Sequence, residues 1–142
     1  MLRLSEDYSL VLYQDVLWGD MDAYGHVNNA VYFRYFEDVR MAYFVETGIM
    51  RIKEETGVGP ILATTTSDFK FPLTYPDKLQ IACKAEVTGP KKVLFEYAIY
   101  SEGHDKLAAT GSSLVVFFDY GRHSSTEVPS EIVAAISDLN HS

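Results

Sequence analysis

Residues 19–29, GDMDAYGHVNN, gather side chains that could carry out acyl-transfer chemistry. Asp20 and Asp22 offer a nucleophile or a general base, and His26 could shuttle protons near neutral pH. An acyl-transfer site also needs donors that stabilise a developing oxyanion. Residues 28 and 29 stand at the start of an expected helix, where free N–H groups and the positive end of the helix dipole supply such donors. The stretch therefore predicts a carboxylate placed beside a helix N-terminus.

Most of these residues also have an ordinary structural interpretation. Asp22 could be a turn aspartate that accepts a hydrogen bond from the nearby backbone. Asp20 is expected to make a loop hydrogen bond or to end a strand. The side chains of Asn28 and Asn29 are typical of helix caps, and Gly25 permits a tight approach of strand to helix.

The helix that would position this site is expected from about Asn29 to about Glu46, with Gly48 as its C-terminal stop. Apolar side chains cover most of its circumference, which is typical of a helix surrounded by protein. We therefore expect a sheet that curls around it. One seam of the helix is expected to form core: Tyr32, Phe36, Val39 and Tyr43.

Alternating β-forming residues predict one strand before this helix and four after it, linked by hairpin-sized turns. Gly111 is expected to mark a bulge in the last strand. A short helical turn is expected over residues 51–60, and a modest surface helix begins with Pro129 as its first residue. The sequence thus predicts one α+β domain over residues 1–142, with a mainly antiparallel sheet. The expected strands are 8–20, 61–71, 78–89, 93–99 and 107–120.

Composition narrows the classes of function. Acidic residues number 20 against 12 basic ones, so the net charge of −8 argues against nucleic-acid binding. The single cysteine, Cys83, is expected to be a buried structural thiol, and it fits a reducing compartment. The four histidines show no metal-ligand spacing, and we expect no metal. Since neither a signal peptide nor a membrane span is evident, a cytoplasmic protein is expected.

The residues around the opening stretch also resemble a known family. Residues 18–40, WGDMDAYGHVNNAVYFRYFEDVR, are similar to the signature of the 4-hydroxybenzoyl-CoA thioesterase-like branch of the hotdog fold. The similarity continues through residues 68–81, 89–100 and 107–119. It implies a curved antiparallel five-stranded sheet wrapped around one long central helix. It also implies that Asp22 is the catalytic carboxylate, that the backbone N–H of Asn29 is the oxyanion donor, and that His26 has a supporting role.

The resemblance further implies an acyl-CoA thioesterase, which hydrolyses its substrate to a free carboxylic acid and coenzyme A (CoA). CoA would be part of the substrate, so no cofactor is expected. Hotdog domains pair through their sheets, which implies a homodimer or homotetramer with acyl-CoA sites at the subunit boundary. An acyl-ACP thioesterase and a non-catalytic acyl-binding module stay open as alternatives. Aryl and fatty acyl groups both fit an aromatic pocket.

Candidate substrate-binding residues follow from the same resemblance. We expect Gly25, Asn28 and Tyr32 to line the substrate site. Lys91 and Lys92 lie in a turn where the family contacts CoA phosphates, although two adjacent lysines usually mark a solvated turn. Lys70 and Arg34 are weaker candidates for the same role. Whether Asp22 acts as nucleophile or as general base stays open.

Overall fold

The computed structural model of the chain describes residues 4–141; residues 1–3 and 142 of the expected domain lie outside this range. Its main sheet has the strand order β1-β3-β4-β5-β2, and all neighbouring strands are antiparallel. A two-residue strand, β6 (Ser124–Ser125), pairs with the end of β5. The five main strands are β1 (Leu10–Asp15), β2 (Val58–Phe69), β3 (Lys78–Gly89), β4 (Lys92–Ser101) and β5 (Lys106–Asp119).

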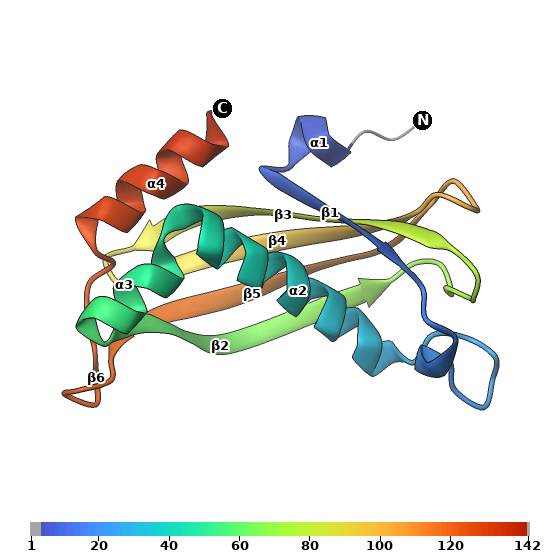
Figure 1. Cartoon of the computed structure of the whole chain (residues 1–142), viewed down its shortest axis with the longest axis horizontal. Helices are drawn as coiled ribbons and strands as arrows, with labels where there is room; N and C mark the ends of the chain where they lie inside the picture. The colour runs from blue at the N-terminus through green and yellow to red at the C-terminus, as the bar shows by residue number, and fades with distance from the viewer. Residues whose placement is uncertain (1–3, 142) are drawn as a thin grey trace.

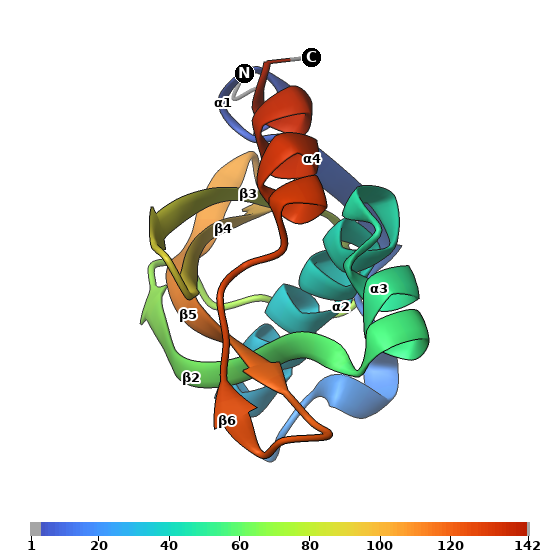
Figure 2. The same cartoon turned by 90° about the vertical axis from the view of Figure 1, so that its left-hand side faces the viewer.

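The long helix α2 (Asn29–Thr47) lies along the concave side of this sheet (Figure 1). The end-on view shows the sheet curving around α2, with the shorter α3 (Ile49–Thr56) beside it (Figure 2). The α2 bounds agree with the prediction because its caps are local: Asn28 caps the start, and Gly48, at φ 82°, turns the chain at the end. The α+β class and the curved five-stranded sheet around one long helix are confirmed.

The predicted seam of α2 is buried in the core. Tyr32, Phe36, Val39 and Tyr43 are each at most 2% exposed. The ring of Phe36 stacks on that of Tyr97 in β4, with centroids 4.6 Å apart. The sheet therefore holds the helix through its aromatic side chains, which fixes where the N-terminus of α2 lies.

Gly111 does not mark a bulge, and that prediction is wrong. It pairs regularly with Tyr97 on one side and Ser67 on the other. A Cβ atom at this position would lie 2.5 Å from the Phe36 ring and 2.5 Å from the backbone oxygen of Thr66. The glycine is required because the aromatic ring of the helix packs directly against the strand backbone.

The first strand is shorter than predicted. It ends at Asp15, which pairs with Lys78, the first residue of β3. Beyond this pair β3 offers no further partner, so the predicted continuation to residue 20 does not form. Trp18–Asp20 instead form a single 3₁₀ turn that leads into the polar loop.

Several other elements differ from the prediction. The short helix α1 (Leu4–Asp7) was not predicted, and neither was β6. β2 already begins at Val58, where the end of a helical turn was expected. Pro129 is the N-cap of α4 (Ser130–Asn140) and not its first helical residue. One side of α4 is buried through Ile132 and Ile136, so it packs on the core more firmly than a surface helix.

The connection from β2 to β3 is not the hairpin turn that was predicted. β2 lies at one edge of the sheet and β3 beside the opposite edge, so residues 70–77 cross the end of the sheet. On the way, the carbonyl of Leu73 accepts a hydrogen bond of 2.8 Å from the Val27 amide. The crossing therefore brings this segment against the polar loop that precedes α2.

Candidate active site

A tight turn presents Asp22. Met21 and Val27 form an isolated antiparallel bridge, and the Asp22 amide donates to the carbonyl of His26 at 2.8 Å. The Gly25 amide donates to the carbonyl of Asp22 at 3.0 Å. Gly25 adopts φ 78°, a left-handed conformation that other residues rarely take, so the turn depends on this glycine. The loop is thus closed by its own backbone rather than left free.

The carboxylate of Asp22 is half-buried, and one of its oxygens is held. Oδ1 accepts a hydrogen bond of 2.9 Å from the amide of Tyr24. This is the turn bond that the structural interpretation of Asp22 foresaw. Within residues 4–141, Oδ2 makes no side-chain hydrogen bond or ion pair, so it is available for chemistry. The same bond that stabilises the turn therefore also orients the carboxylate.

The start of α2 supplies the other half of the site. Asn28 caps the helix through its side-chain oxygen, which accepts from the amide of Ala30 at 2.9 Å. The Asn29 amide makes no hydrogen bond within the described part of the chain. With the helix dipole behind it, this free N–H is suited to a carbonyl oxygen that gains negative charge.

The carboxylate and the free amide line one cleft of about 510 Å³. Asp22, His26, Asn28 and Asn29 come from the turn and the helix start, whereas the opposite wall comes from the end of β2 and the crossing segment. The cleft therefore pairs a polar side that carries the reactive groups with a wall of mainly apolar side chains. That wall contains Phe69, Lys70, Phe71 and Pro72, and Tyr24, Val27 and Tyr32 complete the lining.

Tyr32 supports the wall. Its ring is 2% exposed, and its hydroxyl donates to the carbonyl of Phe71 at 3.3 Å and accepts from the amide of Leu73 at 3.1 Å. Burial raises the pKa of this hydroxyl. Since both bonds hold the crossing segment, the hydroxyl is committed to the shape of the cleft, while the ring faces Phe69 at 5.0 Å.

Asp20 has the structural role that the sequence predicts. Its two carboxylate oxygens accept from Nη1 and Nη2 of Arg34 at 3.0 and 2.6 Å. The guanidinium lowers the pKa of the Asp20 carboxyl, chiefly through these hydrogen bonds. Arg34, a weaker candidate for CoA phosphate, is therefore already paired with a carboxylate.

Of the other predicted site residues, two lie at or beside the cleft and two lie at the opposite end of the sheet. His26 is exposed and lines the cleft, and Gly25 shapes the turn without lining it. Lys91 lies in the turn between β3 and β4, and its amine bonds the hydroxyl of Ser125 at 3.1 Å. This turn is at the end of the sheet next to the C-terminus of α2, far from the cleft in the same chain (Figure 1). Lys92 begins β4 at that end, so the structure does not bring these lysines to Asp22.

Sequence reasoning missed the aromatic wall. Phe69 and Phe71 were read as part of one strand, but β2 ends at Phe69 and the chain then turns across the sheet. Phe69 remains 44% exposed, which is high for a phenylalanine at the end of a strand. Pro72 correctly marks that pairing has ended, but it does not show that the chain then crosses the end of the sheet.

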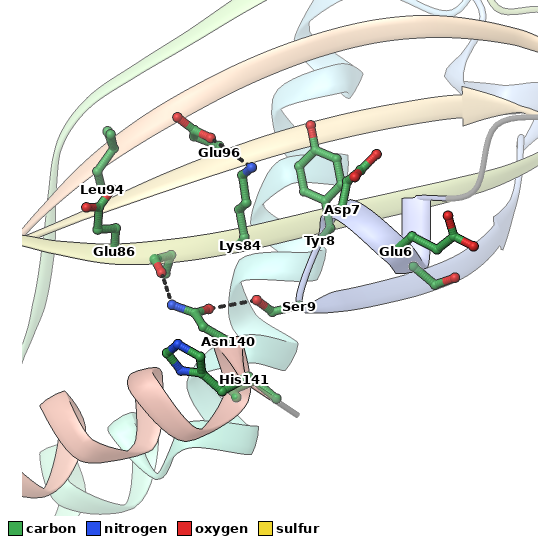
Figure 3. A pocket seen from close by; sticks show the side chains of 13 residues that line it. Glu6, Asp7, Tyr8, Ser9, Lys84, Glu86, Leu94, Glu96, Asn140 and His141 are labelled. Atoms are coloured by element: carbon green, nitrogen blue, oxygen red, sulfur yellow. Dashed lines mark hydrogen bonds and ion pairs between the residues drawn. The ribbon is translucent and has the colours of Figure 1, made fainter.

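A second cavity, also of about 510 Å³, lies on the side of β3 and β4 that faces away from α2 (Figure 3). Among its described lining residues, Lys84 is the one lysine or arginine, and it pairs with Glu96 at 3.6 Å. Its other acidic residues are Glu6, Asp7 and Glu86. This surplus of carboxylates is unsuited to an anionic substrate.

Other reactive groups are accounted for. Cys83 is fully buried, and desolvation raises the pKa of its thiol to about 12, so the expected structural thiol is confirmed. Within residues 4–141, no three His, Cys, Asp or Glu side chains gather as metal ligands would. No helix in the same range has the length and hydropathy to cross a membrane.

Comparison with known proteins identifies the family and the fold. The family profile of the thioesterase-like superfamily matches residues 16–136. The chain is 31% identical to the PA2801 protein of Pseudomonas aeruginosa, with a TM-score of 0.78 over 89% of this chain and 96% of that one. It is 25% identical to a thioesterase of Thermus thermophilus crystallised with CoA and zinc, with a TM-score of 0.82 over 96% of this chain and 98% of that one.

A curated relative, YsmA of Bacillus subtilis, is 28% identical over 82 residues, which are 58% of this chain and 54% of YsmA. The aligned part thus spans about half the length of that protein. The family match, by contrast, takes in the turn that holds Asp22 and every strand of the sheet except β1. The chain therefore belongs to the thioesterase-like superfamily, with its hotdog fold, and is a thioester hydrolase.

Proposed function

We propose that this protein is an acyl-CoA thioesterase that works in the cleft between the Asp22 turn and the crossing segment. The single observation that carries the proposal is the placement of a half-buried carboxylate and the unbonded Asn29 amide on one cleft. CoA is supported as the carrier because the thioesterase of Thermus thermophilus was crystallised with it. Lys70 and His26 at the same cleft give an anionic substrate nearby positive or titratable groups.

In the proposed reaction the thioester carbonyl oxygen lies against the Asn29 amide. The carboxylate of Asp22 then has two routes. It attacks the carbonyl carbon and displaces the CoA thiolate, leaving a mixed anhydride that water opens, or it takes a proton from a water molecule that attacks the same carbon. Both routes consume one water and release a carboxylic acid and CoA. A thiolate leaves readily because thiol pKa values lie near about 8.5, so a strong general acid is not needed.

The cleft wall favours an apolar acyl group. Tyr32, Phe69 and Phe71 line the cleft, and none of these side chains is charged. Burying an apolar acyl group against such rings is favourable at about 25 cal/mol per Å² of apolar area. Both an aryl group and a fatty acyl chain meet this requirement, and a substrate panel distinguishes them.

The decisive test is release of free thiol from acyl-CoA by the wild-type protein and by Asp22→Asn. Because general-base or nucleophilic groups contribute on the order of 10²–10⁴-fold, we expect the variant to lose at least about 100-fold in kcat. Asp138→Asn, the same change at an exposed position on α4, is the matched control and should keep the wild-type rate. A folded Asp22→Asn protein with most of its activity would show that this carboxylate is not catalytic.

The panel should span short, medium, long and aromatic acyl-CoAs, together with matched acyl-ACPs. A strong preference for acyl-ACP would replace CoA as the carrier. Acyl-CoA binding without turnover across the whole panel would instead indicate a non-catalytic acyl-binding module. A cytoplasmic location is part of the same proposal, since the one thiol of the chain needs no oxidising compartment.

We also propose that the protein assembles as a homodimer, or a dimer of dimers, through the edge strand β2. Outside its pairing with β5, this strand has no neighbour in the sheet as far as the described residues show, and its residues from Ile61 to Thr66 are exposed. A long exposed edge presents unpaired backbone groups that a second chain can satisfy. Because Phe69 ends this strand and also lines the cleft, pairing there would put the active site at the subunit boundary. Lys91 and Lys92 could then reach a substrate only from another subunit.

A further inference from the structure

The loop that carries Asp22 is tied to α2 by a two-point ion pair. Asp20 stands two residues before Asp22, and Arg34 stands five residues after Asn29. Both oxygens of Asp20 bond the guanidinium, at 3.0 and 2.6 Å, so the pair resists rotation as well as separation. The same residue is held by its backbone, because its carbonyl accepts from the Asn28 amide at 3.1 Å.

These bonds join the two halves of the site into one unit. The Asp20 backbone is bonded to the residue that caps α2, and the Asp20 side chain is bonded to the second turn of that helix. Between these points the turn closes on itself through the bridge of Met21 and Val27. The Asp20–Arg34 pair is therefore one of the contacts that hold the Asp22 turn beside the start of α2.

This pair differs from Arg51–Glu55, another ion pair on the surface. The side chains of Asp20 and Arg34 are 12% and 43% exposed, whereas those of Arg51 and Glu55 are each 54% exposed. The guanidinium of Arg34 also lies 5.6 Å from the centre of the Tyr35 ring, a buried residue of the core. Exposed pairs contribute little stability because water and salt screen them, but two parallel hydrogen bonds to a largely buried carboxylate fix its orientation.

We propose that Arg34 is a positioning residue for thioester hydrolysis, which sets the spacing between the Asp22 carboxylate and the Asn29 amide; this rests on the proposed function. Arg34 does not touch the substrate in this account. Its contribution is orientation, for which a misplacement of about 1 Å costs on the order of 100-fold in rate. Loss of Arg34 therefore lowers kcat and leaves KM nearly unchanged, because the cleft wall that binds the acyl group stays in place.

The test compares Arg34→Gln, Arg34→Lys and the control Arg51→Gln on the best acyl-CoA of the panel. We expect a fall in kcat of about 10- to 100-fold for Arg34→Gln. Lysine keeps the positive charge but cannot make two parallel hydrogen bonds to the carboxylate, so the kcat of Arg34→Lys should lie between those of Arg34→Gln and wild type. Arg51→Gln removes ion pairs to Glu55 and Glu131 at the other end of the fold and should keep the wild-type kcat.

Hydrogen exchange gives a readout besides activity. The amides of Asp22, Gly25 and Asn28, each bonded within the loop, should exchange faster in Arg34→Gln than in Arg51→Gln. A wild-type kcat in Arg34→Gln overturns the proposal; if that variant does not fold, a wild-type kcat in Arg34→Lys overturns it. An equal fall in the kcat of Arg51→Gln also overturns it. An inactive wild-type protein would instead contradict the proposed function, so the two failures are distinguishable.

Discussion

Replacing Gly111 by alanine tests how tightly α2 is held against the sheet. The new Cβ atom would lie 2.5 Å from Cε2 of Phe36 and 2.5 Å from the backbone oxygen of Thr66. Neither neighbour can yield easily. Phe36 is fully buried and stacked on Tyr97, and the Thr66 oxygen belongs to a strand paired with β5. The substitution therefore forces the helix away from the strand.

Overpacking of a core costs about 1–3 kcal/mol, and two contacts this short place Gly111→Ala at about 3 kcal/mol. Unfolding entropy is about 2.1 cal/mol/K per residue, which gives about 0.3 kcal/mol/K for a chain of this length. The melting temperature should fall by about 10 °C. Urea denaturation followed by circular dichroism, with thermal melts alongside, measures both quantities.

Gly19→Ala is the matched control. A Cβ atom at Gly19 meets no atom within 4 Å, so the change in the free energy of unfolding should stay within about 0.5 kcal/mol. If Gly111→Ala were as stable as this control, the close packing of Phe36 against the strand would not exist in solution. The reason given for the glycine would then be wrong.

Two further predictions concern Asp20 and the β2 edge. Arg34 lowers the pKa of Asp20 in the folded protein, so this carboxylate stabilises the fold above its unfolded pKa of about 3.9, and the contribution is lost as the pH falls through the lower folded value. Urea denaturation should thus give Asp20→Asn a lower free energy of unfolding than wild type at pH 7, and this difference should disappear below about pH 4. A difference that does not change with pH would contradict a stabilising role for the Asp20 carboxylate. The molar mass of the wild-type protein, measured by light scattering, should be at least twice the 16.0 kDa of one chain. Leu62→Lys places a charge at an exposed position of β2 and should shift the molar mass toward that of a monomer. A monomeric wild-type protein would refute pairing through β2.

The parts of the fold that depend on neighbouring residues in the chain were predictable from the sequence. The bounds of α2 follow from Asn28 and Gly48, whose effects act within a few residues. The buried seam follows from periodicity alone, and it correctly placed Tyr43 in the core. Helix bounds and the buried face of a helix can be predicted from the sequence because capping and amphipathicity depend only on residues close together in the chain.

The features that were missed depend on partners far away in the chain. β1 ends where β3 begins, and nothing in residues 16–20 shows this. The need for Gly111 arises from a helix residue 75 positions earlier, although the glycine itself looked like a bulge. These errors concern topology rather than residue chemistry.

The separate origin of the two sides of the cleft has a consequence for how new specificities arise. The turn around Asp22 is closed by its own amides, whereas Phe69 and Phe71 belong to a different segment of backbone. In the proposed mechanism, side-chain changes at Phe69 and Phe71 alter the acyl-binding wall, while the backbone bonds that hold the Asp22 turn, including the one from Val27 to Leu73, stay in place. A protein engineer could diversify those two phenylalanines as a small library and select for new acyl groups, while the hydrolytic apparatus is inherited unchanged.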